Sequence, residues 1–160
     1  MTDQEHTATA TPEHRLLEQR CGRWRVECTF LGGPEPMRTD AIETLEMFGP
    51  FFTVSRFEAE LFGAPYRGQA VTGYEPDRQR WVANWIDTMS PNLLQFTGRY
   101  DAATRTLTMA CDGPGPGGQG VVTYRSAERL VDDQTREFDM WMATPAGQEA
   151  HLLHYRYRRA

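Results

Sequence analysis

Hydrophobic and polar residues alternate along most of the chain. In WRVECTF, residues 24–30, the apolar side chains occupy every second position, which is the period of a half-buried β-strand. Similar runs cover 38–47, 51–61, 66–74, 80–87, 93–100, 105–111, 120–130, 135–143 and 149–158. Turn-forming segments such as GGPEP, FGAP and TPAG separate them, and no long helical pattern intervenes. About ten short strands with tight links predict an all-β antiparallel fold. A closed barrel is favoured because it leaves no strand edge exposed.

The N-terminal segment departs from this pattern. Residues 1–10 are small and polar, so we expect a disordered tail. A short helix should follow, capped by Thr11, with Pro12 in its first turn and Gly22 as its end. His14 is expected on the surface of that helix. The predicted domain organisation is a tail over 1–10 and one barrel domain over 11–160.

Composition narrows the classes of function. The formal charge is −5, which argues against a nucleic-acid partner because such partners require a positive surface. All 17 basic residues are arginine, so a Schiff-base lysine is excluded. The three cysteines have no metal-site spacing and are expected to be reduced thiols. With no signal segment and no membrane-length apolar run, we expect a cytoplasmic protein without a membrane partner; a homodimer is left open.

The segment Gly22-Arg23-Trp24 opens the first strand directly after the helix. Its placement resembles the lipocalin-like (calycin) barrels, whose first-strand tryptophan plugs the closed end beneath a late arginine. The resemblance implies that Trp24 forms such a plug, with Arg158 or Arg156 as the arginine. A guanidinium that stacks on an indole can close the barrel while its charge stays hydrated.

A second resemblance covers almost the whole chain past residue 10. Gly73–Glu75 and Trp85–Met89, with the G-x-W segment and Gly98, are similar to a bacterial family known as domain of unknown function 1579. Glu75 replaces the usual aspartate and Thr88 the usual serine. The resemblance implies a lipocalin-like barrel and no particular reaction.

The C-terminal segment DMWMATPAGQEAHLLHYRYRR resembles the end of nitrobindin-type barrels. In those proteins a histidine of this strand ligates haem iron from inside the barrel, and the resemblance implies His151 for that position. His151 also alternates with Leu153 and Tyr155, so we expect it to point inward and His154 to be exposed. A single candidate ligand does not predict a haem site, and we expect no cofactor. His151 would serve as a metal ligand only if haem binds.

Several side chains are candidates for a ligand site. On strand 80–87, Trp81, Ala83, Trp85 and Asp87 share one face, but alternation does not decide which face points inward. Paired indoles suit an aromatic wall, and Asp87 ends the strand, either at the rim of a pocket or as a turn residue bonded to backbone amides. The residues predicted to touch a ligand are Tyr74, Trp85, Asp87, Trp141 and His151.

The sequence therefore predicts a barrel that binds a small, largely apolar or aromatic molecule. One alternative is an enzyme of small-molecule biosynthesis, a cyclase or isomerase that acts by orientation and desolvation, with Asp87, His151 and Tyr74 as candidate catalytic residues. A second alternative is a nitrobindin-like haem protein. The glycine-rich segment 113–120 is either a lid or an ordinary hairpin loop.

Overall fold

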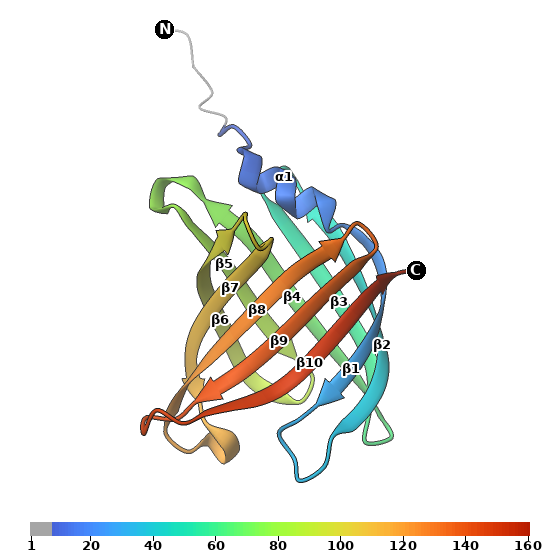
Figure 1. The fold of residues 1–160 in the computed structure, drawn as a ribbon, viewed down its shortest axis with the longest axis vertical. Helices are drawn as coiled ribbons and strands as arrows, with labels where there is room; N and C mark the ends of the chain where they lie inside the picture. The colour runs from blue at the N-terminus through green and yellow to red at the C-terminus, as the bar shows by residue number, and fades with distance from the viewer. Residues whose placement is uncertain (1–7) are drawn as a thin grey trace, which may run out of the picture.

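A computed structural model describes residues 8–160 of the chain, and its main feature is a closed antiparallel β-barrel (Figure 1). Ten strands pair in the order β1-β10-β9-β8-β7-β6-β5-β4-β3-β2, so each strand contacts its neighbours in sequence and β1 closes on β10. The prediction of an all-β antiparallel barrel of about ten strands is confirmed. Most of the predicted tail lies in residues 1–7, outside the described residues.

The strands agree closely with the alternating segments of the sequence, because side chains of one parity face the interior along each strand. Their bounds are β1 Gly22–Phe30, β2 Met37–Phe48, β3 Phe52–Leu61, β4 Ala64–Glu75, β5 Arg80–Asp87, β6 Ser90–Asp101, β7 Thr106–Pro114, β8 Val121–Asp132, β9 Thr135–Ala143 and β10 Glu149–Arg159. Two single 3-10 turns, Pro76–Arg78 and Pro116–Gly118, lie in the connections after β4 and β7.

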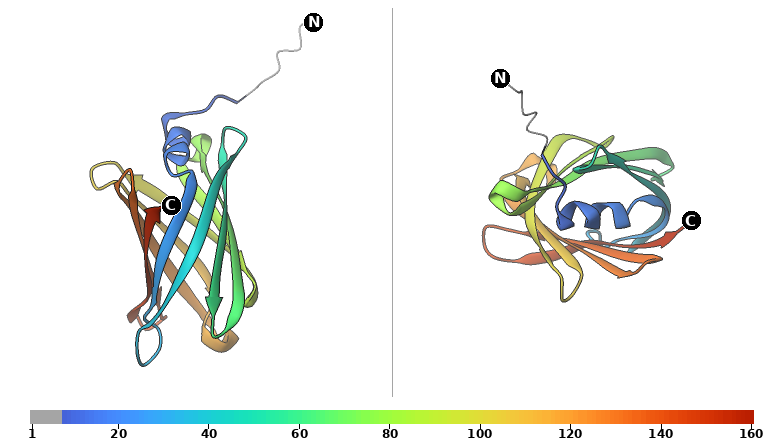
Figure 2. Two further views of the ribbon diagram at one scale, coloured as in Figure 1. Left: turned by 90° about the vertical axis from the view of Figure 1, so that its right-hand side faces the viewer. Right: turned by 90° about the horizontal axis from the view of Figure 1, so that it is seen from above.

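Helix α1, Pro12–Gln19, lies across one end of the barrel (Figure 2). Leu17 is fully buried beneath it. His14 is buried as well, and the expectation of a surface histidine is wrong. Its Nδ1 accepts the backbone N–H of Thr11 at 2.9 Å, and its Nε2 donates to the carbonyl oxygen of Tyr74 at 3.1 Å. The histidine therefore closes the first turn of the helix and attaches it to β4.

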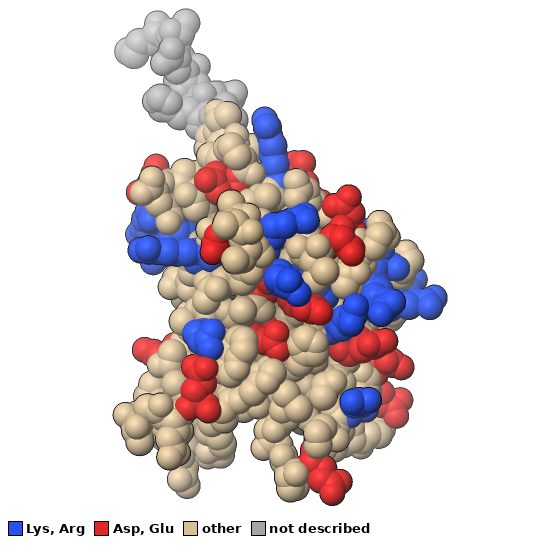
Figure 3. All heavy atoms as spheres, in the orientation of Figure 1, with Lys and Arg blue, Asp and Glu red and all other residues tan. Residues whose placement is uncertain are grey.

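The two ends of the barrel differ. The helix end carries the chain termini of β1 and β10, whereas the opposite end carries the connections β1–β2, β3–β4, β5–β6, β7–β8 and β9–β10. Figure 3 shows few charged side chains at the tips of this second end. Phe62, Met89, Leu93 and Val121 are exposed in or beside its loops. We refer to it as the open end, because the interior cavity described below reaches it.

Candidate ligand-binding cavity

The interior of the barrel contains a cavity of about 710 Å³. Exposed residues of the β5–β6 and β7–β8 connections, such as Met89 and Gly117, and Asn92 at the start of β6 border it at the open end. Glu43, Glu128, Arg136 and Tyr157 border it toward the helix end. A volume in this range suits a small organic molecule, since ligand pockets measure about 300–1,000 Å³.

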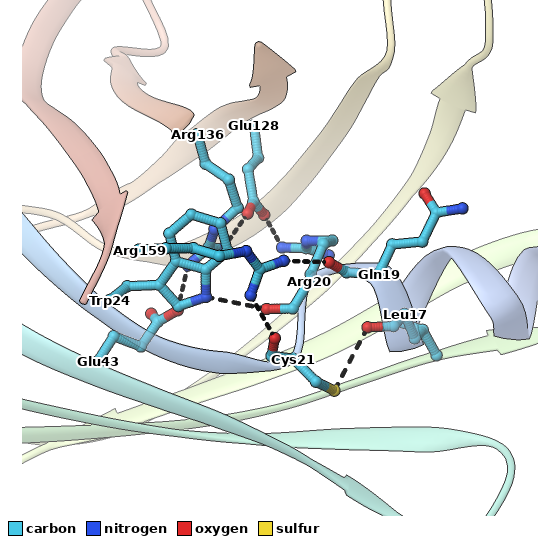
Figure 4. A network of polar contacts seen from close by, with 9 residues as sticks. All are labelled: Leu17, Gln19, Arg20, Cys21, Trp24, Glu43, Glu128, Arg136 and Arg159. Carbon is cyan, nitrogen blue, oxygen red and sulfur yellow. Dashed lines mark hydrogen bonds and ion pairs between the residues drawn. The ribbon is translucent and has the colours of Figure 1, made fainter. Parts of the chain in front are cut away.

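The helix end of the cavity is closed by Trp24, which is fully buried (Figure 4). Its Nε1 donates to the carbonyl oxygen of Arg20 at 3.0 Å. Two guanidinium groups stack on its indole, those of Arg159 at 4.3 Å and Arg136 at 4.5 Å from the ring centroid. The structure thus shows Trp24 as a buried plug.

The arginines expected over Trp24 were Arg158 or Arg156, and this expectation is wrong. Both are exposed on the outer face of β10. Arg159 has the same parity as the inward Tyr157, and it pairs with Trp24 in the β1–β10 register. It also donates to the carbonyl oxygens of Gln19 and Cys21 at 2.6 Å, so it ties the end of helix α1 to the plug.

A network of buried ion pairs lies beside the plug (Figure 4). Arg136, which is 2 % exposed, donates to the carboxylates of both Glu43 and Glu128, and Arg20 donates to Glu128 as well. Burial alone raises the pKa of Glu128, but the charges of Arg20 and Arg136 outweigh this and hold the pKa below its usual value. Glu128 is therefore ionised, and the four formal charges sum to zero.

Aromatic side chains form the middle of the cavity wall. Phe57 stacks on Tyr155 with ring centroids 5.5 Å apart, and it meets the edges of Tyr66 and Trp85, each at 6.2 Å. Phe138 also packs against Tyr155, with ring centroids 6.0 Å apart. Burial raises the pKa of the Tyr66 and Tyr155 hydroxyls, with the Asp87 carboxylate adding to the effect. Both phenols are therefore neutral at physiological pH.

Trp85 and Asp87 both line the cavity, which shows that the face of β5 shared by Trp81, Ala83, Trp85 and Asp87 points inward. The Trp85 indole donates from Nε1 to Asp87 Oδ2 at 2.9 Å. It also lies over Gly68, where an added Cβ would come within 2.2 Å of the ring. The orientation of Trp85 is thus determined by its hydrogen bond to Asp87 and by the space that the absence of a Cβ at Gly68 leaves for the ring.

The W-x-D-T-M segment can now be understood as one structural unit. Asp87 Oδ1 accepts the backbone N–H groups of Met89 and Ser90, at 2.8 and 3.1 Å, as expected of a turn aspartate. Thr88 Oγ1 accepts the backbone N–H of Arg67 on the neighbouring strand at 3.1 Å. The segment therefore builds the β5–β6 turn and positions Trp85 at the same time. Asp87 acts on the site through Trp85 and lies at the rim.

Tyr74 lies away from these residues. It is at the helix end of β4, where its ring packs on Trp81 at 5.4 Å and near His14 at 6.1 Å. Tyr74 is not among the residues that line the cavity. Its position follows from the length of β4, because Thr72, the inward residue just before it, is the last residue of that strand to line the cavity.

His151 does not point inward, contrary to the expectation from alternation. The register of β10 against β9 shifts between His151 and Leu153, and such a bulge reverses the face on which the preceding residues lie. Leu153, Tyr155 and Tyr157 line the cavity, whereas His151 is exposed on the outer face. Its Nε2 lies 2.8 Å from Asp139 Oδ1, which His154 Nδ1 also contacts at 2.8 Å.

Trp141 also lies on the outer face of the barrel, directly opposite His151 in the β9–β10 register. Its indole lies between the His151 ring, stacked at 5.0 Å, and the guanidinium of Arg125 at 4.2 Å. Of the five residues predicted to touch a ligand, the structure brings only Trp85 and Asp87 together at the cavity.

The interior does not fit a haem group held by histidine. His14 is bonded to Thr11 and Tyr74, and His151 and His154 contact Asp139 outside the barrel, so none of the three histidines in residues 8–160 borders the cavity. Within the same residues, no cluster of three or more His, Cys, Asp or Glu side chains is suited to a metal ion.

Other cavity residues were not among the predicted ligand contacts, chiefly Phe57, Tyr66, Arg136 and Tyr155. Parity along β3, β4 and β10 was the signal that could have placed the aromatic ones, since each occupies an inward position of an alternating run. The glycine-rich connection after β7 also borders the cavity, and Tyr124 donates to the carbonyl oxygen of Pro114 at 2.8 Å where that connection begins.

Comparisons with known proteins agree with this fold. The sequence profile of the family described as "Protein of unknown function (DUF1579)" matches residues 9–159. No curated protein sequence matches significantly. The crystal structure of Rv2717c from M. tuberculosis aligns with a TM-score of 0.72 at 13 % identity, over 95 % of this chain and 99 % of that one. The S-type phycobiliprotein lyase CPES from Guillardia theta aligns with a TM-score of 0.58 at 11 % identity, over 91 % of each chain.

Proposed function

This chain belongs to the DUF1579 family, and we propose that its function is to bind a small, largely apolar or aromatic molecule inside the barrel. The observation that carries the proposal is the cavity of about 710 Å³, closed at one end by Trp24 and bordered at the other by exposed loops. Ligand sites are typically concave, mostly apolar and equipped with a few convergent polar groups. This cavity has that character.

Stacking on the aromatic wall is the main attraction that the cavity offers. Phe57, Trp85 and Tyr155 present flat apolar surfaces, and Gly68 with Asp87 holds Trp85 in place before any ligand arrives. A side chain that is already ordered loses little conformational entropy on binding. The ordered aromatic wall therefore favours a flat ligand, which can stack on these rings, over a flexible chain.

The proposal is tested with an anilinonaphthalene dye and two matched tryptophan variants. Trp85→Ala should weaken dye binding about two- to twelvefold, since an aromatic pair contributes about 0.5–1.5 kcal/mol beyond its area. Trp141→Ala removes an indole of the same size from the outer face and should leave the dissociation constant within about twofold. Fluorescence titration measures both. A folded protein that binds no apolar probe saturably would contradict the proposal.

The enzyme alternative receives less support from the site. Proton transfer in the cavity needs a group that is free to exchange a proton. Glu128 is held ionised by two arginines, and Asp87 accepts three hydrogen bonds. The candidate catalytic residues Tyr74 and His151 do not border the cavity. Catalysis by cavity shape alone stays a prediction, tested by turnover of a candidate cyclisation or isomerisation substrate.

The haem alternative also receives no support, because His151 lies outside the barrel. A cytoplasmic location stays a prediction, and a homodimer stays open. No helix in residues 8–160 has the length and apolar character needed to cross a membrane.

A further inference from the structure

The side chains that line the cavity carry an unbalanced negative charge. Two arginines, Arg20 and Arg136, and three carboxylates, Glu43, Glu128 and Asp87, border it, which leaves a net formal charge of −1. The arginines pair with Glu43 and Glu128 at the helix end. The charge that remains is therefore that of Asp87, at the open end. A lone carboxylate beside a partly desolvated cavity attracts a cation and repels an anion.

Asp87 has hydrogen-bond donors around it but no counter-charge. Within residues 8–160 it forms no ion pair with an arginine or histidine side chain. Its carboxylate accepts hydrogen bonds from the backbone N–H groups of Met89 and Ser90 and from the Trp85 indole. These donors are uncharged, so they hold the carboxylate in one orientation without cancelling its formal charge. The structure thus fixes a negative charge at the mouth of the cavity.

Aromatic rings extend from Asp87 into the cavity. Trp85 donates to its carboxylate, and Phe57 meets the rings of both Trp85 and Tyr66 at 6.2 Å. Burial is the largest cause that raises the pKa of the Tyr66 hydroxyl, and the negative charge of Asp87 is the next, so the carboxylate acts on this part of the wall. The faces of aromatic rings attract cations as well. A positive group between Asp87 and these rings is therefore stabilised by both.

The helix end of the cavity does not suit a cation. Arg136 is buried there, and Arg20 contacts the same carboxylate, that of Glu128, so an added positive charge would meet two guanidinium groups. Asp87 is only half-buried at the rim, where an incoming charge keeps part of its hydration and pays a smaller desolvation cost than in the deep interior. The charged group of a ligand thus belongs near Asp87, and its apolar part belongs deeper in the barrel.

We propose that the ligand is an aromatic molecule that carries one ammonium group, with the ammonium group beside the Asp87 carboxylate and the ring stacked on Trp85 and Phe57. The proposal rests on the proposed binding function and specifies the charge of its ligand. It also gives Asp87 a direct contact with the ligand, in addition to its hydrogen bond to Trp85.

Three probes with the same ring system test the proposal by displacement of N-phenyl-1-naphthylamine, an uncharged anilinonaphthalene dye. At about pH 7, 2-naphthylmethylamine carries an ammonium group, 2-ethylnaphthalene has nearly the same shape without a charge, and 2-naphthylacetate is an anion. The wild type should bind the amine at least about tenfold more tightly than the acetate, because only the amine finds an opposite charge at the mouth. This comparison needs no variant.

A pair of variants assigns the preference to Asp87. Asp87→Asn removes the charge and should weaken the amine about tenfold more than it weakens 2-ethylnaphthalene, the effect of one hydrogen bond to a charged group. The uncharged probe is needed because the substitution also alters the bond to Trp85, which affects both probes alike. Asp112→Asn removes the same charge from the exposed outer face of β7 and should leave the ratio of the two affinities within about twofold, since solvent screens that position.

The binding outcomes separate this inference from the proposed function. Equal weakening of the amine and of 2-ethylnaphthalene by Asp87→Asn, or no change in either, would mean that Asp87 serves only the turn and Trp85, and would overturn the inference while the binding function stands. Binding of 2-naphthylacetate to the wild type as tight as that of the amine would overturn it as well. If the wild type bound neither the dye nor any of the three probes, the binding function itself would fail and this inference with it.

Discussion

Arg136 is the residue whose replacement tests the energetics of the barrel interior most directly. It is 2 % exposed, donates to Glu43 and Glu128, and stacks on the rings of Trp24 and Tyr157 at 4.5 and 4.1 Å. Arg136→Met keeps much of the apolar contact but removes the charge. Breaking a buried ion pair by removing one partner typically costs about 3–5 kcal/mol, because a buried charge is left uncompensated. We expect a loss of that size in the free energy of unfolding.

The loss should depend on pH in a defined direction. In the wild type the folded-state pKa of Glu128 is lowered, so its contribution to stability is present above the unfolded pKa and is lost only as the pH falls through the folded value. Without Arg136 one lowering influence disappears and burial, which raises the pKa, gains weight. In the variant, protonation of Glu128 at mildly acidic pH then removes its buried negative charge and restores part of the lost stability. The deficit relative to the wild type should therefore shrink from about pH 8 to about pH 5.

Urea denaturation followed by tryptophan fluorescence measures both effects. Arg158→Met is the matched control, because Arg158 is exposed on the outer face of β10, and it should change stability by less than about 0.5 kcal/mol. An Arg136→Met loss below about 1 kcal/mol would refute the argument from buried charge. A deficit that stays constant with pH would refute the role assigned to Glu128.

Two further predictions concern the plug and the aromatic wall. Trp24→Ala should cost about 3–5 kcal/mol in the same urea assay, since the side chain is fully buried, and a loss below about 1 kcal/mol would mean that Trp24 does not close the barrel. Gly68→Ala would place a Cβ within 2.2 Å of the Trp85 ring, so the ring must move. Dye affinity should then fall several-fold, and unchanged affinity would show that the orientation of Trp85 does not matter for binding.

Alternation of apolar and polar residues was sufficient to predict the strands and the barrel. The alternation in WRVECTF predicts β1, and the turn-forming segments predict where the strands begin and end. Both succeed because strand period and turn chemistry are local properties of a chain. The burial of Trp24 was also predictable, since it follows from the position of G-x-W between a helix and the first strand. In W-x-D-T-M the sequence contained two of the predicted contact residues, Trp85 and Asp87.

The errors arose where a position depends on pairing between distant segments. His151 was expected inside because Leu153 and Tyr155 share its parity, but a bulge in β10 places it outside, and a bulge is decided by how β10 pairs with β9. Trp141 is different, because alternation along β9 alone places it outside, with Arg136, Phe138 and Met140 in the inward positions.

The interior polar groups could be located only by the closed barrel. Arg136 meets Glu43 across 93 residues of sequence, and Arg159 reaches Gln19 across 140. The sequence by itself determined which residues alternate into the interior, because that follows from backbone geometry along one strand. Only the tertiary structure decided which interior groups meet, which stay unpaired and how much space remains, since these depend on register and closure among all ten strands.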